Sequence, residues 1–450
     1  MPDPILTRDQ AKALTDRALS FATADETRVN VRGGWSGNTR FAGSEITTAG
    51  GTTDVSVSVT STVGRRSASA STNVLDDDGL RRVVEQAERL ARLSPEDPEY
   101  LPALGPQQYT TVNGYAASTA ELTPEARALA VERVLQGVNE VGRESGVATD
   151  DLFVAGFLEA SAGVASAVAT SRGLFAYHPA TEASLSVTVR TNDGTGSGYA
   201  SSGANDWNLL DAAALGRYAA QKAIASRNPQ ALEPGRYTVI LEPQAVADFM
   251  GSLMGAFQAR STDEGRGPFS KAGGGSRVGE RIADPRITLL ANPADPELLT
   301  TPFDNEGLPV RGATYIENGV LKDLAYSRWW AEQKGRQPSG GGGRKMLGTN
   351  KSLADIIAGT ERAILCTRFW YIRFLDQRTV MTTGLTRDGT FLVENGRITR
   401  PLKNFRWNDS PLQALNRIEE IGRAERVQAG VVMPSLKIRD FNFTSTSDAI

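Results

Sequence analysis

The stretch Tyr237–Phe257, YTVILEPQAVADFMGSLMGAF, organises the second half of the chain. It opens with Thr238–Leu241, a β-branched and apolar run that is typical of a buried strand. Pro243 follows, and proline is favoured in the first turn of a helix because its missing N–H would have no partner there. Apolar residues then recur at steps of one, three and four, which predicts an amphipathic helix packed on a core: Ala245, Val246, Phe249, Met250, Leu253, Met254 and Phe257.

The other face of this helix carries only small and polar residues: Gln244, Asp248, Gly251, Ser252 and Gly255. It has no histidine, no cysteine and no pair of carboxylates. This face therefore offers no set of metal ligands.

The composition places the chain among ordinary globular proteins, with 40% hydrophobic and 22% charged residues. Its 450 residues predict two or three domains. A net charge of −3 gives no electrostatic reason to expect nucleic acid or an anionic membrane as partner. No apolar run reaches the length of a membrane span, and we expect no secretion signal. The single cysteine excludes an intrachain disulfide and favours a cytoplasmic location.

The chain has one histidine, His178, and one cysteine, Cys366. A three-histidine zinc site and a two-histidine helix motif are therefore impossible within one chain. Cys366 and His178 could pair as nucleophile and base, but Cys366 lies in an apolar run typical of a buried, inert thiol. His178 precedes Pro179 and is expected in a loop, in a structural role.

Residues 1–230 predict an N-terminal α+β domain of antiparallel strands with helices. Helices are expected over about 7–20, 78–93, 123–144 and 211–227. Strands are expected over 27–35 and 39–47 with a turn between them, then over 152–161, 164–171 and 182–190, and Val and Ser alternate over 55–59. The glycine- and serine-rich stretch 192–203 lacks the strand and helix of a phosphate-binding loop, so a flexible surface loop is expected.

Residues 231–450 predict a C-terminal β-rich domain of hairpins with peripheral helices. Asn318-Gly319 and Asn395-Gly396 predict tight hairpins, because both residue types tolerate positive φ. A strand is expected over Arg286–Ala291. The glycine-rich stretches 265–279 and 338–344 predict loops, and the four glycines of the second imply either mobility or a close approach of the backbone to something else.

Five segments, in this order, make the chain resemble the TldD/PmbA family of metallopeptidases and related proteins. They are the strand–Pro–helix above, FDNEG at 303–307, TYIENGVL at 314–321, FLVENGRI at 391–398 followed by Pro401-Leu402-Lys403, and MPSLKIRDF at 433–441. In the catalytic branch of that family, TldD, the helix after the proline carries HExxxH. Its histidines bind zinc with its glutamate as general base, and a cysteine near the C-terminus is a further ligand.

None of these zinc-site residues is present in this chain. The first histidine falls on Gly251, the glutamate on Ser252 and the second histidine on Ala256, and residues 421–433 contain no cysteine. The resemblance is therefore closest to the PmbA/TldE-like branch, which lacks the motif. It implies that this face of the helix is free of metal and serves packing or forms the wall of a chamber. It implies a subunit that forms a heterodimer with a TldD-like, HExxxH-bearing paralogue, with zinc only in that partner, and a role in cytoplasmic proteolysis or processing of unfolded peptides.

Two other functions stay open. One is a self-sufficient hydrolase that uses carboxylates, and the other is a homodimeric peptide-binding or scaffold protein without peptidase activity. The candidate substrate-binding residues are Asp304 and Glu306 in the FDNEG turn and Arg387 and Asp388 in TRDG, since paired carboxylates can do acid–base work. Turn formation is the simpler interpretation of all four, because Asp and Asn before Gly hydrogen-bond their own backbone.

Overall fold

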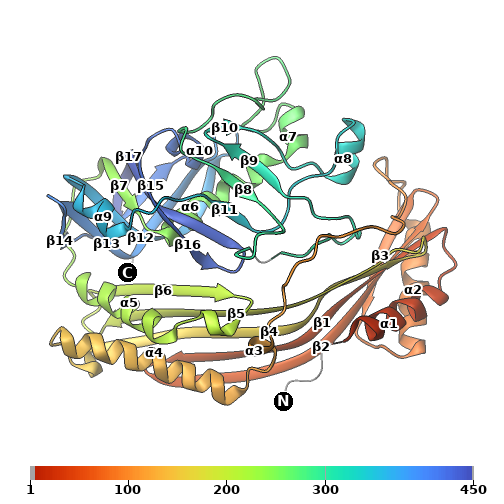
Figure 1. The fold of residues 1–450 in the computed structure, drawn as a ribbon, viewed down its shortest axis with the longest axis horizontal. Helices are drawn as coiled ribbons and strands as arrows, with labels where there is room; N and C mark the ends of the chain where they lie inside the picture. The colour runs from red at the N-terminus through yellow and green to blue at the C-terminus, as the bar shows by residue number, and fades with distance from the viewer. Residues whose placement is uncertain (1–5, 299, 448–450) are drawn as a thin grey trace.

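The structure is a computed structural model that describes residues 6–298 and 300–447. It contains a six-stranded sheet built from residues 26–204 and an eleven-stranded sheet built from residues 235–447, which we call the N-terminal and the C-terminal sheet. Figure 1 shows the C-terminal sheet stacked over the N-terminal one. The α+β fold class expected from the sequence is confirmed. Within the described residues, no helix combines the length and apolarity that a membrane span needs.

The N-terminal sheet is antiparallel throughout, in the order β3-β2-β1-β4-β5-β6. Its side chains alternate between the two faces: Val57 and Val59 are fully buried, whereas Ser56 and Ser58 are half-buried. The strands are β1 (Glu26–Ala42), β2 (Glu45–Val63), β3 (Arg66–Thr72), β4 (Leu152–Thr170), β5 (Phe175–Thr191) and β6 (Ser197–Ala204).

Four long helices cover one face of this sheet. They are α1 (Arg8–Ser20), α2 (Asp77–Leu93), α4 (Pro124–Glu144) and α5 (Ala212–Ala225); a short α3 (Ala117–Ala120) precedes α4. Each long helix begins at a side chain that accepts a hydrogen bond from the first turn: Thr7, Asp76, Thr123 and Asp211. Helices α1 and α2 pack on one half of the sheet and α4 and α5 on the other.

Several expected strand boundaries are wrong. Strand β1 runs unbroken through the turn expected between residues 35 and 39, because Gly37 and Asn38 pair in register with Gly51 and Gly50 of β2. The chain reverses instead at Gly43-Ser44, where both residues have positive φ. Residues 152–161 and 164–171 likewise form one strand, β4, which continues through Gly163 opposite Gly34.

The expectation of a flexible loop over 192–203 is also wrong for most of its length. Residues 197–204 form β6, which pairs with β5. Its glycine content serves packing, because a Cβ on Gly198 would lie 2.1 Å from the carbonyl oxygen of Ala219 in α5. Glycine lets a helix lie directly against the strand, and composition alone does not distinguish that role from loop flexibility.

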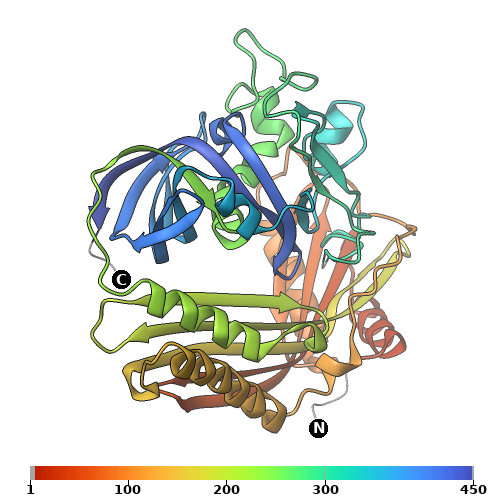
Figure 2. The same cartoon turned by 60° about the vertical axis from the view of Figure 1, so that its left-hand side comes forward.

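The C-terminal sheet closes on itself. Strands β17, β15, β13, β12 and β7 follow one another by pairing, and β17 also pairs with β7, so these five form a ring (Figure 2). The strands of the whole sheet are β7 (Gly235–Leu241), β8 (Leu289–Ala291), β9 (Ala313–Glu317), β10 (Val320–Leu321), β11 (Arg344–Met346), β12 (Arg362–Asp376), β13 (Met381–Glu394), β14 (Arg397–Pro401), β15 (Asn404–Asp409), β16 (Ile418–Gln428) and β17 (Val431–Ser447).

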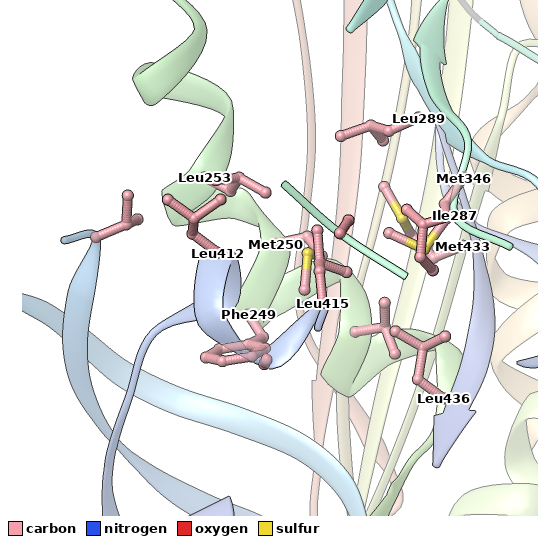
Figure 3. Packing of buried hydrophobic residues seen from close by; sticks show 14 of the residues in the cluster. Phe249, Met250, Leu253, Ile287, Leu289, Met346, Leu412, Leu415, Met433 and Leu436 are labelled. Atoms are coloured by element: carbon pink, nitrogen blue, oxygen red, sulfur yellow. The ribbon is translucent and has the colours of Figure 1, made fainter. Parts of the chain in front are cut away.

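Helix α6 (Pro243–Met254) lies at the centre of the largest hydrophobic core. The Phe249 ring meets the ring of Trp407 edge-on, with centroids 5.4 Å apart, and also contacts Phe369 and Phe441. Figure 3 shows the buried residues around it. The shorter helices α7 (Ala259–Asp263), α8 (Arg328–Gln333) and α9 (Leu353–Ala358) lie outside the ring. Helix α10 (Pro411–Ala414) packs against α6 instead, with Leu412 and Ala414 in the same core.

Both predicted Asn-Gly hairpins are confirmed. Asn318-Gly319 joins β9 to β10 and Asn395-Gly396 joins β13 to β14, and all four residues have positive φ. The strand expected over Arg286–Ala291 is shorter and begins at Leu289, because Asp284 accepts a hydrogen bond from the Arg286 N–H and holds the preceding residues in a turn.

The two glycine-rich stretches differ in their surroundings. A Cβ on Gly273, Gly274 or Gly275 would meet nothing within 4 Å. In the second stretch, a Cβ on Gly340 would lie 2.7 Å from the Ala325 side chain, and one on Gly342 would lie 2.8 Å from the Thr300 hydroxyl. The second stretch therefore contains glycines that allow a close approach, one of the two alternatives considered for it.

Candidate functional site

Helix α6 begins as the sequence predicts, directly after β7 and with Pro243 in its first turn. Glu242 precedes the helix but does not cap it with its side chain. Its carboxylate instead accepts hydrogen bonds from Tyr218 and Lys222 of α5, and the Lys222–Glu242 ion pair is largely buried. The start of α6 is thereby fixed to a helix of the N-terminal sheet.

The first half of the polar face of α6 also contacts the N-terminal sheet. Ser201 of β6 donates a hydrogen bond to Gln244 over 3.1 Å, and the Gln244 amide donates to Asp248 over 2.8 Å. The second carboxylate oxygen of Asp248 accepts from the backbone N–H of Phe369 over 3.0 Å. A single hydrogen-bonded chain thus links β6, α6 and β12.

Asp248 is the titratable group on this face whose pKa departs most from its usual value. Burial raises the pKa of Asp248 to about 6, against the opposing effects of its hydrogen bonds and of Arg368 and Arg344. Burial also lowers the pKa of Arg344, which Asp248 partly offsets. The sequence shows Asp248 only as one polar residue of a helix, because its burial depends on strands more than 90 residues away.

The second half of the polar face carries the positions of the zinc motif. A Cβ on Gly251 or on Gly255 would meet nothing within 4 Å, so this part of the face borders open space. Ser252 is half-buried. The α-helix ends at Met254 and Ala256 lies in a short 3-10 turn, so the three mapped positions do not share one regular helix.

These residues do not fit a zinc ion, since glycine, serine and alanine offer none of the nitrogen, sulfur or carboxylate ligands that zinc takes. Across residues 6–298 and 300–447, no group of three or more His, Cys, Asp or Glu side chains is arranged to hold a metal. That this chain works without a metal stays a prediction.

Asp304 and Glu306 are held by turn contacts. The Asp304 carboxylate accepts hydrogen bonds from the backbone N–H groups of Glu306 and Leu308, over 2.8 and 3.0 Å. The Glu306 carboxylate pairs with Arg328 over 2.9 Å. Asn305 between them contacts Asn30 and Arg32 of β1, so the turn is seated on the N-terminal sheet.

Arg387 and Asp388 lie elsewhere, beside β6. Asp388 has positive φ and is buried, and its carboxylate accepts a hydrogen bond from Ser197 over 2.6 Å. Arg368 approaches the same carboxylate to 3.4 Å and Arg387 to 3.8 Å. The structure therefore does not combine the two predicted residue pairs into one site: Asp304 and Glu306 lie by β1, whereas Arg387 and Asp388 lie by β6.

Cys366 and His178 are likewise apart. Cys366 is fully buried in β12, where burial and the charge of Glu242 raise the pKa of its thiol far above the usual value. The expected loop position of His178 is wrong, because His178 lies in β5 and is buried. Burial lowers the pKa of His178, whose neighbours are backbone groups of Gly114 and Thr300 rather than a thiol.

A large cavity was not foreseen from the sequence. It has a volume of 780 Å³ and lies between the N-terminal sheet and the segments of the C-terminal half around Thr300, Phe303 and Gly342. Its sheet side carries Arg32, Asp54 and Glu182 among serines, threonines and small residues. A mixed polar and apolar cleft of this size is suited to bind a short peptide or a similar organic ligand.

Three glycines form the floor of this cavity. A Cβ on Gly34 would lie 2.2 Å from the carbonyl oxygen of Ala162, and a Cβ on Gly163 would lie 2.2 Å from that of Gly33. Strands β1 and β4 pair here as antiparallel neighbours, and their backbones approach to a distance that only glycine allows. In the sequence, the only indication of this close approach is the pair Gly33-Gly34 within a strand. The pair does not reveal the approach until the pairing of Gly34 with Gly163 is known.

Models of one protein family match most of the chain. Residues 29–91 match domain 1 of the PmbA/TldA metallopeptidases, residues 118–227 match the central domain and residues 234–445 match the C-terminal domain.

Similar proteins carry related names. The crystal structure of TldE from Thermococcus kodakarensis is similar with a TM-score of 0.81 and 20% identity, over 96% of this chain and 99% of that one. A metalloprotease from Methanothermobacter thermautotrophicus is 23% identical over 290 residues, which is 59% of this chain and 61% of that protein. A zinc metalloprotease TldD homolog from Saccharolobus solfataricus is 23% identical over 220 residues, covering 44% of this chain and 46% of its own length. The matches thus span about half to three-fifths of these two relatives.

Proposed function

This chain belongs to the PmbA/TldD family of metallopeptidases and related proteins, and we propose that it is the TldE-like, non-catalytic subunit of a two-subunit metallopeptidase. A TldD-like paralogue bearing HExxxH supplies the zinc and cuts the peptide. This chain supplies one wall of the chamber in which unfolded or flexible peptides are held. The assembly works in the cytoplasm.

The observation that carries the proposal is the polar face of α6. Gly251, Ser252 and Ala256 stand where zinc ligands and a general base would be needed, and their side chains can neither bind zinc nor activate water. Gly251 and Gly255 border open space, so this face is available as a surface facing substrate or partner. The likeness in fold to a protein named TldE supports the same assignment.

The test compares the purified chain alone with the chain co-expressed with an HExxxH-bearing paralogue from the same genome. Zinc per chain is measured by mass spectrometry, and hydrolysis is measured on an unfolded protein such as reduced casein. We expect less than a tenth of a zinc ion per chain and no hydrolysis for the chain alone. With the paralogue, we expect a stable complex and zinc-dependent hydrolysis.

Two variants serve as matched controls. Changing the motif glutamate of the paralogue to glutamine abolishes hydrolysis, whereas Ser252→Ala in this chain leaves it unchanged. Stoichiometric zinc or chelator-sensitive hydrolysis by this chain alone would overturn the proposal.

A homodimeric peptide-binding protein is the second candidate, because the 780 Å³ cavity is formed by this chain without a partner. It predicts a dimer by light scattering and micromolar binding of unfolded peptide in the absence of any paralogue. The self-sufficient hydrolase gains no support from the turn contacts of Asp304 and Glu306.

A further inference from the structure

A second large cavity lies on the helix-covered face of the N-terminal sheet, opposite the cleft described above. Its volume is 590 Å³. Trp35 of β1 and residues 49–51 and Thr53 of β2 line it, together with residues 122–125 and Arg127 at the start of α4. It is situated between the area of the sheet covered by α1 and α2 and that covered by α4 and α5.

Arg127 is the unusual residue of this cavity. It is only 2% exposed, and among the described residues no carboxylate lies within ion-pair distance of it. Its Nε donates to the Thr39 hydroxyl over 3.3 Å and its Nη2 to the Gly50 carbonyl over 3.4 Å, and both bonds are long. The buried Nη1 has no hydrogen-bond partner in the described part of the chain.

Burying the charged guanidinium of Arg127 is electrostatically unfavourable. Burial lowers the pKa of Arg127, yet a guanidinium stays charged at any physiological pH. A buried cation without a directly paired carboxylate is unfavourable, and the exposed Glu125 offsets only part of that cost. The Trp35 ring, 5.5 Å from the guanidinium carbon, offsets only part of that cost through a cation–π contact.

The sheet beneath the cavity has glycines where it contacts the Arg127 side chain. Gly37 of β1 pairs with Gly51 of β2, so two glycines face each other in mid-sheet. A Cβ on Gly37 would lie 2.6 Å from Nη1 of Arg127 and 2.6 Å from the Trp35 ring. Glycine inside a strand often marks a place where a ligand approaches the backbone.

The start of α4 adds positive potential at the rim. This helix has 21 residues and begins at Pro124, and the N-terminus of a long helix favours anions. The exposed Glu125 carboxylate is already bonded to its own N–H and to Thr123, which lower its pKa, and solvent screens its charge. Glu125 lines the cavity and its charge raises the pKa of Arg127, but among the described contacts the two form no ion pair, so no carboxylate neutralises the guanidinium directly.

We propose that this cavity binds an organic anion, whose carboxylate or phosphate group pairs with Arg127 while its body lies against Trp35. The planar fork of arginine matches both groups. The site is on the opposite face of the sheet from the cleft and from α6, and the inference does not depend on the proposed subunit role.

The experiment measures binding and thermal stability of the full chain at constant ionic strength in chloride buffer. The probes are inorganic phosphate, phenylacetate and its neutral counterpart phenylacetamide. We expect at least one anion to bind wild type and raise its Tm, whereas phenylacetamide does neither. The anion that binds more tightly identifies the preferred head group.

Three variants test the site. Arg127→Met removes the buried charge, and we expect at least tenfold weaker anion binding together with a Tm in chloride equal to or above that of wild type. Gly51→Leu places a side chain in the cavity, where a Cβ would be 3.5 Å from Nε1 of Trp35, and should weaken binding to the same extent while Arg127 itself is kept. Arg133→Gln, an exposed arginine on the same helix, should leave binding unchanged.

Two kinds of result would overturn the anion-site proposal. Failure of both anions to bind wild type at 10 mM (about the weakest affinity of interest), or binding that Arg127→Met and Gly51→Leu leave unchanged, overturns the proposal. So does a Tm of folded Arg127→Met well below that of wild type in chloride, because that would make Arg127 a structural residue.

Discussion

At the scale of single residues, Asp248 belongs to no sequence motif, yet its surroundings in the fold raise the pKa of its carboxyl group. Its neighbours in space are the Gln244 amide, the Phe369 N–H and the guanidinium groups of Arg344 and Arg368. These contacts favour the charged carboxylate, but burial outweighs them. The outcome is a carboxyl group with a pKa of about 6 on the same helix face as Gly251 and Ser252.

This environment makes stability depend on pH in a defined direction. Because the pKa of Asp248 is raised from 3.8 to about 6, the native state binds a proton that the unfolded state has released between those values. The contribution of Asp248 therefore falls as pH rises from 4 to 6, by at most about 3 kcal/mol. The free energy of unfolding of wild type and of Asp248→Asn is measured in urea at pH 4.5, 5.5, 6.5 and 7.5. As the pH rises, wild type should lose stability relative to the variant. Asp150→Asn, at an exposed aspartate, serves as control, and a difference that does not vary with pH contradicts the prediction.

At the scale of secondary-structure elements, the close pairing of β1 with β4 depends on glycine. Gly33, Gly34 and Gly163 bring two backbones together at the floor of the 780 Å³ cavity. Any side chain there must separate the strands, since the atoms it would meet belong to the backbone and cannot rotate away.

We therefore expect Gly163→Ala to destabilise the protein by about 1–3 kcal/mol. Gly50→Ala is the matched control, because a Cβ there would be 3.9 Å from the nearest atom and should change stability by less than about 0.5 kcal/mol. Denaturant unfolding of both variants measures the difference. Equal stabilities would show that β1 and β4 can separate without cost.

Much of the element pattern was predictable from local chemistry. The strand–Pro–helix at Tyr237–Phe257, both Asn-Gly hairpins and the capped helices follow from short-range rules. The predictions that were wrong concern segments whose structure depends on partners far away in sequence. Residues 197–204 look like a loop until α5 packs on them, and Gly37-Asn38 look like a turn until Gly50-Gly51 pair with them.

The candidate site was predictable only in part, for the same reason. The absence of metal ligands on α6 is visible in the sequence, whereas the cavities and the buried state of Asp248 and Arg127 exist only after the sheets form. A lone polar residue gives no local indication of its burial.

At the scale of the whole molecule, polar side chains join the two halves of the chain. Ser197 and Ser201 of β6 bond to Asp388 and Gln244, and Lys222 of α5 pairs with Glu242. The side chains of Lys222 and Glu242 are only 12% and 3% exposed. The relative placement of the halves therefore depends on buried polar contacts, which are directional and costly to leave unpaired.

Removing one partner of the buried Lys222–Glu242 ion pair should lower the free energy of unfolding substantially. Lys222→Met leaves Glu242 buried with Tyr218 as its remaining donor, and we expect a loss of about 3 kcal/mol. The double variant Lys222→Met/Glu242→Leu should lose less than Lys222→Met alone, because no charge is left unpaired. Urea unfolding of the full mutant cycle measures the coupling. Additive losses would argue against a coupled pair.

The ring of the C-terminal sheet has a consequence for synthesis of the protein. Strand β7 is made soon after the N-terminal sheet, but its partners β12 and β17 follow more than 100 residues later, and β17 follows every other strand. During translation the N-terminal sheet can form while β7 and α6 emerge with their apolar faces uncovered. A ribosome that stalls before residue 431 therefore holds a half-folded chain with an open sheet edge, which is the kind of nascent chain that chaperones recognise.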